Sequence, residues 1–345
     1  MSISKSSRPT MLDVAKLAGV SYQTVSRVIN DHPYVSKEVR QRVEAAIKTL
    51  DYHPSKAATK LASKSSKIIA TVLYGSWFPG LAEIALNVEL AAKTSGFDVI
   101  LINITEPKKQ LVEALDNVKA WAVDGIILIV PVQGLSSDEV QGICENTPFV
   151  FIDSHQATNV PSVVIDEAYG TQELVEHLIH LGHTRFGEIS GPLDWLNAQT
   201  RHRACIQTFE AHGMEPPLHV EANWTVSGGY RAAKQLLAGQ YLPTAIIAAN
   251  DSMALGAMRA LHEAGLAVPE DVSVVGFDNI PEAAYFTPPL TTVRRNLIQL
   301  GMTGFEYLMQ RMDDPDTPPQ QQVILPRVMF RASTRAFSEQ PVAKL

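Results

Sequence analysis

Residues 10–30 read Thr-Met-Leu-Asp-Val-Ala-Lys-Leu-Ala-Gly-Val-Ser-Tyr-Gln-Thr-Val-Ser-Arg-Val-Ile-Asn, and this stretch decides the fold of the N-terminal region. Thr10 is a favourable N-cap for a first helix, and Gly19 can adopt the left-handed conformation that ends it. Ser21 can then cap a second short helix that begins at Tyr22. Two short helices separated by a tight glycine turn are typical of a helix-turn-helix.

The apolar positions of these two helices predict which faces are buried. On the first helix we expect Leu12, Val14 and Ala15 to face inward. On the second helix the inward stripe is Val25, Val28 and Ile29, which leaves four side chains facing outward: Tyr22, Gln23, Ser26 and Arg27. Gln and Arg can each make paired hydrogen bonds to base edges in the major groove of DNA. The outward face is therefore a predicted DNA-reading surface.

A third helix and a short linker complete the N-terminal region. Ser36 can cap the third helix, whose apolar positions 39, 43, 47 and 50 recur at helical spacing. Pro54 ends this headpiece, which we place at residues 1–54. Residues 55–66 are rich in Ala, Ser and Lys, a composition that favours a flexible tether. Leu61 and the two alanines before it would nevertheless share one side of a short helix.

The charge of the chain is unevenly distributed. Residues 1–67 carry twelve Lys and Arg against five Asp and Glu, whereas the remaining 278 residues carry 17 against 31. A basic head on an acidic body places the polyanion-binding surface in the head. A merely soluble terminus, or a three-helix packing or dimerisation module, is the alternative interpretation of this region.

Several classes of protein are disfavoured by what the sequence lacks. No apolar run approaches the roughly 20 residues that span a bilayer, and the first thirty residues contain no signal-peptide core, so we expect a cytoplasmic protein without a membrane partner. Cys144 and Cys205 are expected to be free thiols. Neither a phosphate-binding loop nor a nucleophile elbow is present, and His180 with His183 lacks a third metal ligand. We therefore predict no enzyme activity, no catalytic residue, no cofactor and no metal.

Residues 67–345 alternate apolar runs with amphipathic segments. The expected strands are Ile68–Leu73, Asp98–Ile104, Gly125–Val130, Phe149–Asp153, Val163–Asp166, Arg185–Gly191, Ala245–Ala249 and Val272–Asp278. The expected helices include Glu83–Thr94, Gly170–Leu181, Ala198–Ala211, Val226–Leu237 and Ser252–Ala264. Apolar strands with helical crossovers indicate parallel sheets covered on both faces. Because there are too many elements for one sheet, we predict an α/β fold of two doubly wound lobes.

Polar residues follow several of these strands. Asp153, Asn250 and Asp278 each end an apolar run, and ligands of parallel sheets bind beyond the carboxyl ends of strands. Arg201 and Trp224 are further candidates, since an indole face with polar groups around it suits a sugar. Helix capping by the polar residues and ordinary packing of Trp224 are the alternatives.

The stretch 10–30 resembles the headpiece of the lactose/galactose repressor family of bacterial transcriptional regulators. The resemblance continues through further segments, namely Val35-Ser, Val43-Glu-Ala-Ala, Leu61-Ala, Leu181-Gly-His, Pro243-Thr-Ala, residues 249–259, Val274-Val-Gly-Phe-Asp and Pro288-Pro-Leu-Thr-Thr. It covers nearly the whole chain and implies two periplasmic-binding-protein-like lobes behind the headpiece.

The resemblance also implies how DNA is bound. A homodimer would read a pseudo-palindromic operator in double-stranded DNA, with Tyr22, Gln23 and Arg27 contacting bases. Leu61 would be the minor-groove wedge of a hinge helix, in place of the tether that composition favours. The DNA-binding set then comprises Tyr22, Gln23, Ser26, Arg27, Asn30, Lys56, Lys60 and Leu61.

For the effector site, the resemblance implies a small sugar whose binding weakens operator affinity. The expected contacts are Tyr74, Asp153, Arg201, Trp224, Asn250, Asp278 and Leu297. Trp224 follows Glu221-Ala-Asn as in a lactose-responsive member of the family, which implies a galactoside. A different sugar, a purine corepressor or a sugar-transport protein are the alternatives. After Arg331 there are no apolar heptads, so we expect a dimer rather than a tetramer.

Overall fold

The computed structural model describes residues 9–29, 32–53, 65–131, 137–144, 147–154 and 160–337. The chain divides into two compact units, Met1–Ser66 and Lys67–Leu345. Among the described residues, no helix combines the length and the apolar character needed to cross a membrane.

The first unit contains three helices whose ends are fixed by local capping. Helix α1 (Met11–Ala18) begins with a reciprocal capping box between Thr10 and Asp13, and it ends at Gly19, whose φ of 63° is left-handed. Helix α2 (Tyr22–Ile29) is capped by the Ser21 hydroxyl, which accepts from the Thr24 amide at 3.2 Å. Helix α3 (Lys37–Thr49) begins at Ser36, as predicted. These caps are all encoded within four residues of the helix that they start.

The core of this unit confirms most of the predicted inward positions. Val14, Val25, Val28 and Val43 are buried together. The prediction for Leu12 is wrong, because 66% of that residue is exposed and Ala18 takes the inward position instead. On an eight-residue helix the inward stripe is narrow, and positions 14, 15 and 18 fill it at helical spacing.

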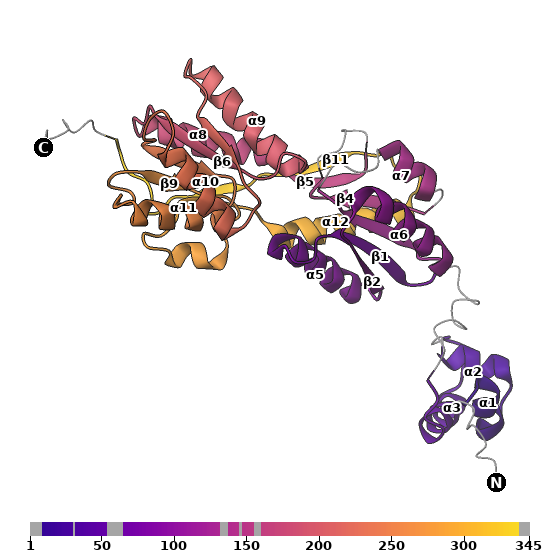
Figure 1. Ribbon diagram of the computed structural model, residues 1–345. Coiled ribbons are helices and arrows are strands. Elements are labelled where there is room, and N and C mark those ends of the chain that lie inside the picture. The colour runs from indigo at the N-terminus through magenta and orange to yellow at the C-terminus, as the bar shows by residue number, and fades with distance from the viewer. Residues whose placement is uncertain are drawn as a thin grey trace, which may run out of the picture. The chain divides into compact units, whose positions relative to one another are not determined.

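The second unit contains two parallel sheets, each with helices on both faces (Figure 1). The first sheet has the order β11-β5-β4-β3-β1-β2, with bounds β1 Ile68–Tyr74, β2 Asp98–Ile104, β3 Gly125–Ile129, β4 Phe149–Ile152, β5 Ser162–Ile165 and β11 Gln321–Ile324. Its helices are α5 (Pro79–Thr94) packed with α12 (Leu297–Asp313), and α6 (Pro107–Trp121) packed with α7 (Ser137–Cys144). The predicted doubly wound lobe is therefore present.

The second sheet has the order β7-β6-β8-β9, with bounds β6 Phe186–Ser190, β7 Leu218–Glu221, β8 Ala245–Ala248 and β9 Ser273–Val275. Its helices are α8 (Glu167–His180), α9 (Leu196–Ala211), α10 (Val226–Leu237) and α11 (Asp251–Glu263). Successive side chains of β8 project from opposite faces of the sheet, so they belong to two different hydrophobic cores. Ala245 and Ile247 pack with residues of α8 and α9, whereas Ile246 and Ala248 pack with residues of α10 and α11.

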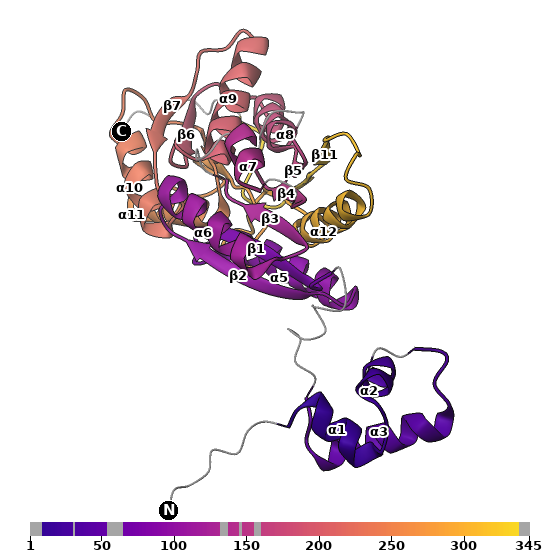
Figure 2. The ribbon, with the colours of Figure 1, turned by 90° about the vertical axis from the view of Figure 1, so that its right-hand side faces the viewer.

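The two lobes are interleaved in the sequence. The chain leaves the first lobe after β5, builds the second lobe, and returns through β10 (Thr292–Arg294) to form α12 and β11 (Figure 2). It then crosses again to β12 (Arg327–Met329), which pairs antiparallel with β10. The crossovers place the ends of both sheets, and the segment around residues 295–298, next to one another.

Both cysteines are buried free thiols, as expected. His183 is a core histidine rather than a surface ligand. Its two ring nitrogens lie 3.0 Å from Thr244 Oγ1 and 3.1 Å from Ser273 Oγ.

Candidate functional site

The outward face of α2 is the candidate nucleic-acid surface. Tyr22, Gln23 and Arg27 are exposed and Ser26 is half-buried, while Val25 and Val28 fill the opposite side. The turn before α2 is held by Arg42 of α3, whose guanidinium donates to the Ala18 carbonyl at 2.5 Å and to the Gly19 carbonyl at 3.0 Å. The structure thus presents three predicted base-reading side chains on one face.

Four other predicted DNA contacts lie outside the described residues. They are Asn30, Lys56, Lys60 and Leu61. Their roles stay predictions from the sequence.

A cavity of about 690 Å³ opens in the second unit, between the carboxyl ends of its two sheets. The first turns of α5 and α12 line it from one lobe, with Asp153 at the end of β4. The second lobe contributes α9, the Trp224 segment, Asn250, and residues 278–282. The cavity is therefore at the position where parallel α/β sheets bind ligands.

Six of the seven predicted effector contacts line this cavity. They are Asp153, Arg201, Trp224, Asn250, Asp278 and Leu297. Tyr74 does not line it. Its ring lies behind Trp195, edge-on at 5.4 Å between centroids, and it also contacts Trp77 at 6.3 Å. Tyr74 thus supports an aromatic wall from behind.

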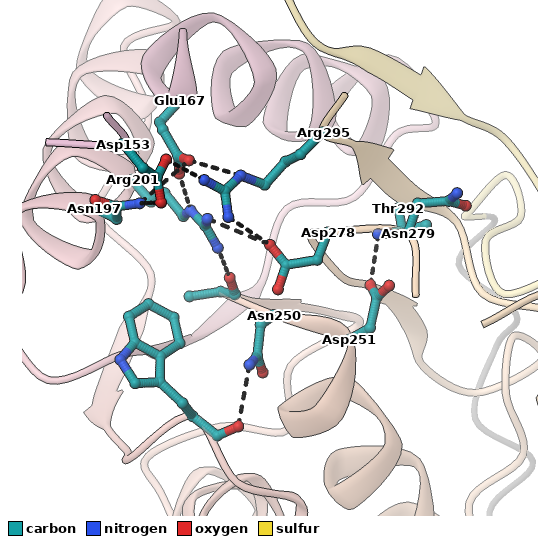
Figure 3. Close-up of polar contacts among 12 residues, drawn as sticks. Asp153, Glu167, Asn197, Arg201, Asn250, Asp251, Asp278, Asn279, Thr292 and Arg295 are labelled. Carbon is teal, nitrogen blue, oxygen red and sulfur yellow. Dashed lines mark hydrogen bonds and ion pairs between the residues drawn. The ribbon is translucent and has the colours of Figure 1, made fainter. Parts of the chain in front are cut away.

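One end of the cavity is a cluster of buried charges (Figure 3). Arg295 donates to Asp153, and its guanidinium nitrogens lie 3.0 Å from Glu167 Oε1 and 3.6 Å from Asp278 Oδ1. Arg201 donates to Glu167 and to the Ala249 carbonyl, and it lies 3.5 Å from Asp278. Three carboxylates therefore share two guanidinium groups; the Asp153 and Glu167 side chains are almost fully buried, whereas 26% of the Asp278 side chain is exposed.

This electrostatic environment shifts the pKa values of its members. Burial alone would lower the pKa of Arg295, but Asp153, Glu167 and Asp278 together raise it. Burial raises the pKa of Asp278, although the two arginines oppose that shift. Burial and the neighbouring Asp278 raise the pKa of Asp251 to about 7, against hydrogen bonds from Thr292 and the Ile280 amide. The cluster is rich in hydrogen-bond acceptors held in fixed positions.

An aromatic part of the cavity wall adjoins this charged cluster, since the Arg201 guanidinium lies 5.6 Å from the centroid of the Trp224 ring. Trp224 has a left-handed φ of 66°, and its carbonyl accepts from the Asn250 side chain at 3.0 Å. Its ring lies edge-on to Trp195, with centroids 5.8 Å apart, and a Cβ on Gly191 would lie only 2.3 Å from it. Within the described chain, Trp224 Nε1 and Asn197 Oδ1 are buried atoms without a hydrogen-bond partner. An unpartnered donor and an unpartnered acceptor thus lie in cavity-lining residues.

The sequence interpretation missed several residues of the site. Glu167 reads as the ordinary acidic first-turn residue of a helix capped by Asp166, and Arg295 follows a three-residue strand without any local pattern. Trp195 and Asn197 precede or begin α9, where their helical context gave no signal. Only the fold brings these residues together with Asp153.

A helix-turn-helix unit joined to a two-lobed domain with a cavity between its sheets defines a ligand-responsive DNA-binding regulator. Residues 10–55 match the family model described as bacterial regulatory proteins, lacI family, and residues 175–334 match the periplasmic binding protein-like domain. The chain is 35% identical to the lactose operon repressor of Escherichia coli (strain K12) over 302 residues, which are 87% of this chain and 84% of that relative.

Two further relatives agree with these matches. The ribose operon repressor of Escherichia coli (strain K12) is 33% identical over 327 residues, covering 94% of this chain and 99% of the relative. A solved structure of the lac repressor dimer bound to operator and the anti-inducer ONPF superposes with a TM-score of 0.91 at 33% identity, covering 96% of this chain and 100% of that one. The chain belongs to the LacI family and is a DNA-binding transcriptional repressor, not an enzyme.

Proposed function

We propose that this repressor is a homodimer that binds a pseudo-palindromic operator and is released from it by a galactoside. The observation that carries the effector assignment is the cavity itself. Residues with carboxylate, amide and guanidinium groups line it together with Trp195 and Trp224. Sugar hydroxyls would meet the polar groups, and the apolar face of the sugar ring would meet the indoles.

The similarity to the lactose operon repressor supports a galactoside. The ribose operon repressor is nearly as similar, and its name points to a different sugar. The alternative effectors are therefore another sugar or a purine corepressor, for which the aromatic wall of the cavity would provide a stacking surface. The experiment below separates them.

The exposed apolar surface of the first lobe supports dimerisation. Leu86 and Leu90 on α5, and Leu101 on the edge strand β2, are exposed large side chains on two elements that pack together. Such a patch is unusual on a monomer. The lac repressor structure cited above is a dimer on its operator.

In the proposed mechanism, Tyr22, Gln23 and Arg27 read bases in the major groove. Residues 55–66 would cross the minor groove, with Leu61 as a wedge and Lys56 and Lys60 on phosphates. Galactoside in the cavity would favour a different arrangement of the two lobes and so weaken operator binding. The sugar can shift this equilibrium only by its differential affinity for the two states, typically about 1–3 kcal/mol of coupling.

The test is fluorescence anisotropy of the full-length protein on a labelled lac-operator-like palindrome and on a scrambled duplex. We expect selective binding that isopropyl thiogalactoside reverses. Arg27→Ala should reduce the preference for the operator by about 1–3 kcal/mol, whereas Arg203→Ala, an exposed arginine of α9, should not. Asp278→Asn should abolish release by the galactoside and keep operator binding, with Asp313→Asn as the matched surface control.

Release by ribose or another sugar, or tighter binding with hypoxanthine, would replace the galactoside but keep the regulator. Equal affinity for both duplexes would contradict the assignment of α2 as the base-reading helix for this operator.

A further inference from the structure

A second polar cluster lies in the second lobe, on the face of the sheet covered by α8 and α9. Glu188 of β6 and His219 of β7 are direct partners in the parallel register, so they project from the same face. His202 reaches them from α9, and its Nδ1 lies 2.8 Å from Glu188 Oε2. One ligating atom from each of these three residues lies within 4.8 Å of the other two.

The buried carboxylate makes this cluster unusual. Glu188 is only 3% exposed, and a charged carboxylate in such a place needs a positive partner. The hydrogen bond that His202 donates to Glu188 raises the pKa of His202, and partial desolvation of its ring lowers the pKa of His219. The two imidazole rings are 4.5 Å apart, so positive charges on both would repel each other. The cluster therefore favours one cation shared by all three side chains.

We propose that Glu188, His202 and His219 form a binding site for one divalent transition-metal ion of the Zn²⁺ type. Two imidazole nitrogens and one carboxylate oxygen are the ligands that Zn²⁺ takes when a fourth position is left for water. Tetrahedral ligands around Zn²⁺ are about 3.4 Å apart. The His202 Nδ1–Glu188 Oε2 pair, at 2.8 Å, would have to widen slightly, and the pairs separated by up to 4.8 Å would have to close by up to about 1.4 Å. Mg²⁺ and Ca²⁺ prefer more oxygen ligands than this cluster offers.

The surroundings of the cluster fit an open metal site. His219 is exposed, which gives an ion and a water molecule a path from solvent. Ser190 Oγ lies 2.8 Å from His219 Nε2, and Ser190 belongs to the same strand as Glu188. Cys205, one turn after His202 on α9, is not counted as a ligand because it is not among the residues whose ligating atoms lie together.

The ion would join three elements, β6, β7 and α9, of which α9 also lines the cavity described above. His202 is adjacent to Arg201 on α9, and Trp224 follows the strand that carries His219. A bound ion would therefore fix α9 relative to β6 and β7. The site itself does not depend on which effector the cavity takes.

The test is isothermal titration calorimetry of the untagged full-length protein with ZnCl₂ in metal-free buffer. We expect one ion per chain. Glu188→Gln and His219→Ala should each weaken binding by at least about tenfold, since even partners outside the coordination sphere contribute that much. His262→Ala removes an exposed histidine of α11 and should change nothing.

Visible absorption with Co²⁺ in place of Zn²⁺ gives a second readout. A d–d spectrum typical of tetrahedral nitrogen and oxygen ligands should form with the parent protein and His262→Ala, and fail to form with His219→Ala. Because His219 is exposed, its replacement should leave the fold intact, which circular dichroism can verify. The proposal would be overturned if the parent protein did not bind one Zn²⁺ per chain. It would also be overturned if the Glu188→Gln and His219→Ala variants bound Zn²⁺ with the affinity of the parent protein.

Discussion

Replacing Arg295 by methionine should destabilise the second unit strongly. Arg295 is 6% exposed and contacts Asp153 and Glu167, whose side chains are 1% and 0% exposed. In the variant, Arg201 still pairs with Glu167, but among the described residues the side-chain partner left to Asp153 is the Asn197 amide at 3.2 Å. Breaking a buried ion pair from one side typically costs about 3–5 kcal/mol, because the other charge stays buried without compensation.

Urea unfolding followed by tryptophan fluorescence measures this loss, at one protein concentration for all variants. The four tryptophans lie at positions 77, 121, 195 and 224, so the signal reports only on the second unit. The matched control is Arg259→Met, which breaks a 2.8 Å pair with Glu263 in which the two side chains are 62% and 40% exposed. That surface pair should contribute at most about 1 kcal/mol.

A second substitution tests the stated cause. If the main cost of Arg295→Met is the buried Asp153 carboxylate left without a positive partner, Asp153→Asn should recover part of the lost free energy of unfolding in the Arg295→Met background. In the parent protein the same change should be destabilising, because it removes a partner of Arg295. The reasoning is refuted if Arg295→Met costs no more than the surface control, or if Asp153→Asn is equally harmful in both backgrounds.

Two further results are expected. Gly191→Ala should displace the Trp224 ring, because a Cβ at position 191 would lie 2.3 Å from it. Tryptophan emission should change and sugar affinity should fall. Unaltered emission and affinity would contradict this packing. Asp251 has a folded-state pKa raised to about 7, so its proton stabilises the folded protein below about pH 4, and that contribution is lost as the pH rises through 7. The deficit of Asp251→Asn in free energy of unfolding should therefore be about 2–3 kcal/mol larger at pH 5 than at pH 8, and a pH-independent deficit would be inconsistent with this pKa.

The predictability of the fold depended on how local its determinants are. The helices of the first unit were predicted because Thr10, Gly19, Ser21 and Ser36 cap them from within a few residues. The long apolar strands were predicted because their continuous apolar runs are likewise visible in the local sequence. Strand β7 was missed because it is four residues long and alternates partly buried with exposed positions. The three-residue strands β10 and β12 depend on non-local pairing: they pair with each other, and Arg294 of β10 also forms a bridge with Asp278.

In the candidate site, too, residues with a local sequence signal were predicted and residues without one were missed. Asp153, Asn250 and Asp278 were found because polar residues at strand ends have a general meaning in parallel sheets. Arg295 was not found, because its partner Asp153 lies 142 positions earlier and no local pattern connects them. Tyr74 is the last residue of β1, but its ring packs edge-on against Trp195, which lines the cavity while Tyr74 does not. Position after a strand therefore predicts the edge of the sheet, and packing decides which side chains face the ligand.

Under the proposed function, the cluster of buried charges would couple a ligand in the cavity to both lobes. Asp153 ends β4 of the first lobe, whereas Glu167 begins α8 and Asp278 follows β9 of the second lobe. Arg295 lies on the crossover between β10 and α12 and contacts all three carboxylates. In that proposal, a ligand hydroxyl that took a hydrogen bond from Arg295, or gave one to Asp153, would compete with the contact that joins the lobes. Because the side chains of Arg295, Asp153 and Glu167 are almost fully buried, each lost contact would be costly unless the ligand replaced it. Ligand binding and lobe arrangement would then depend on the same few hydrogen bonds.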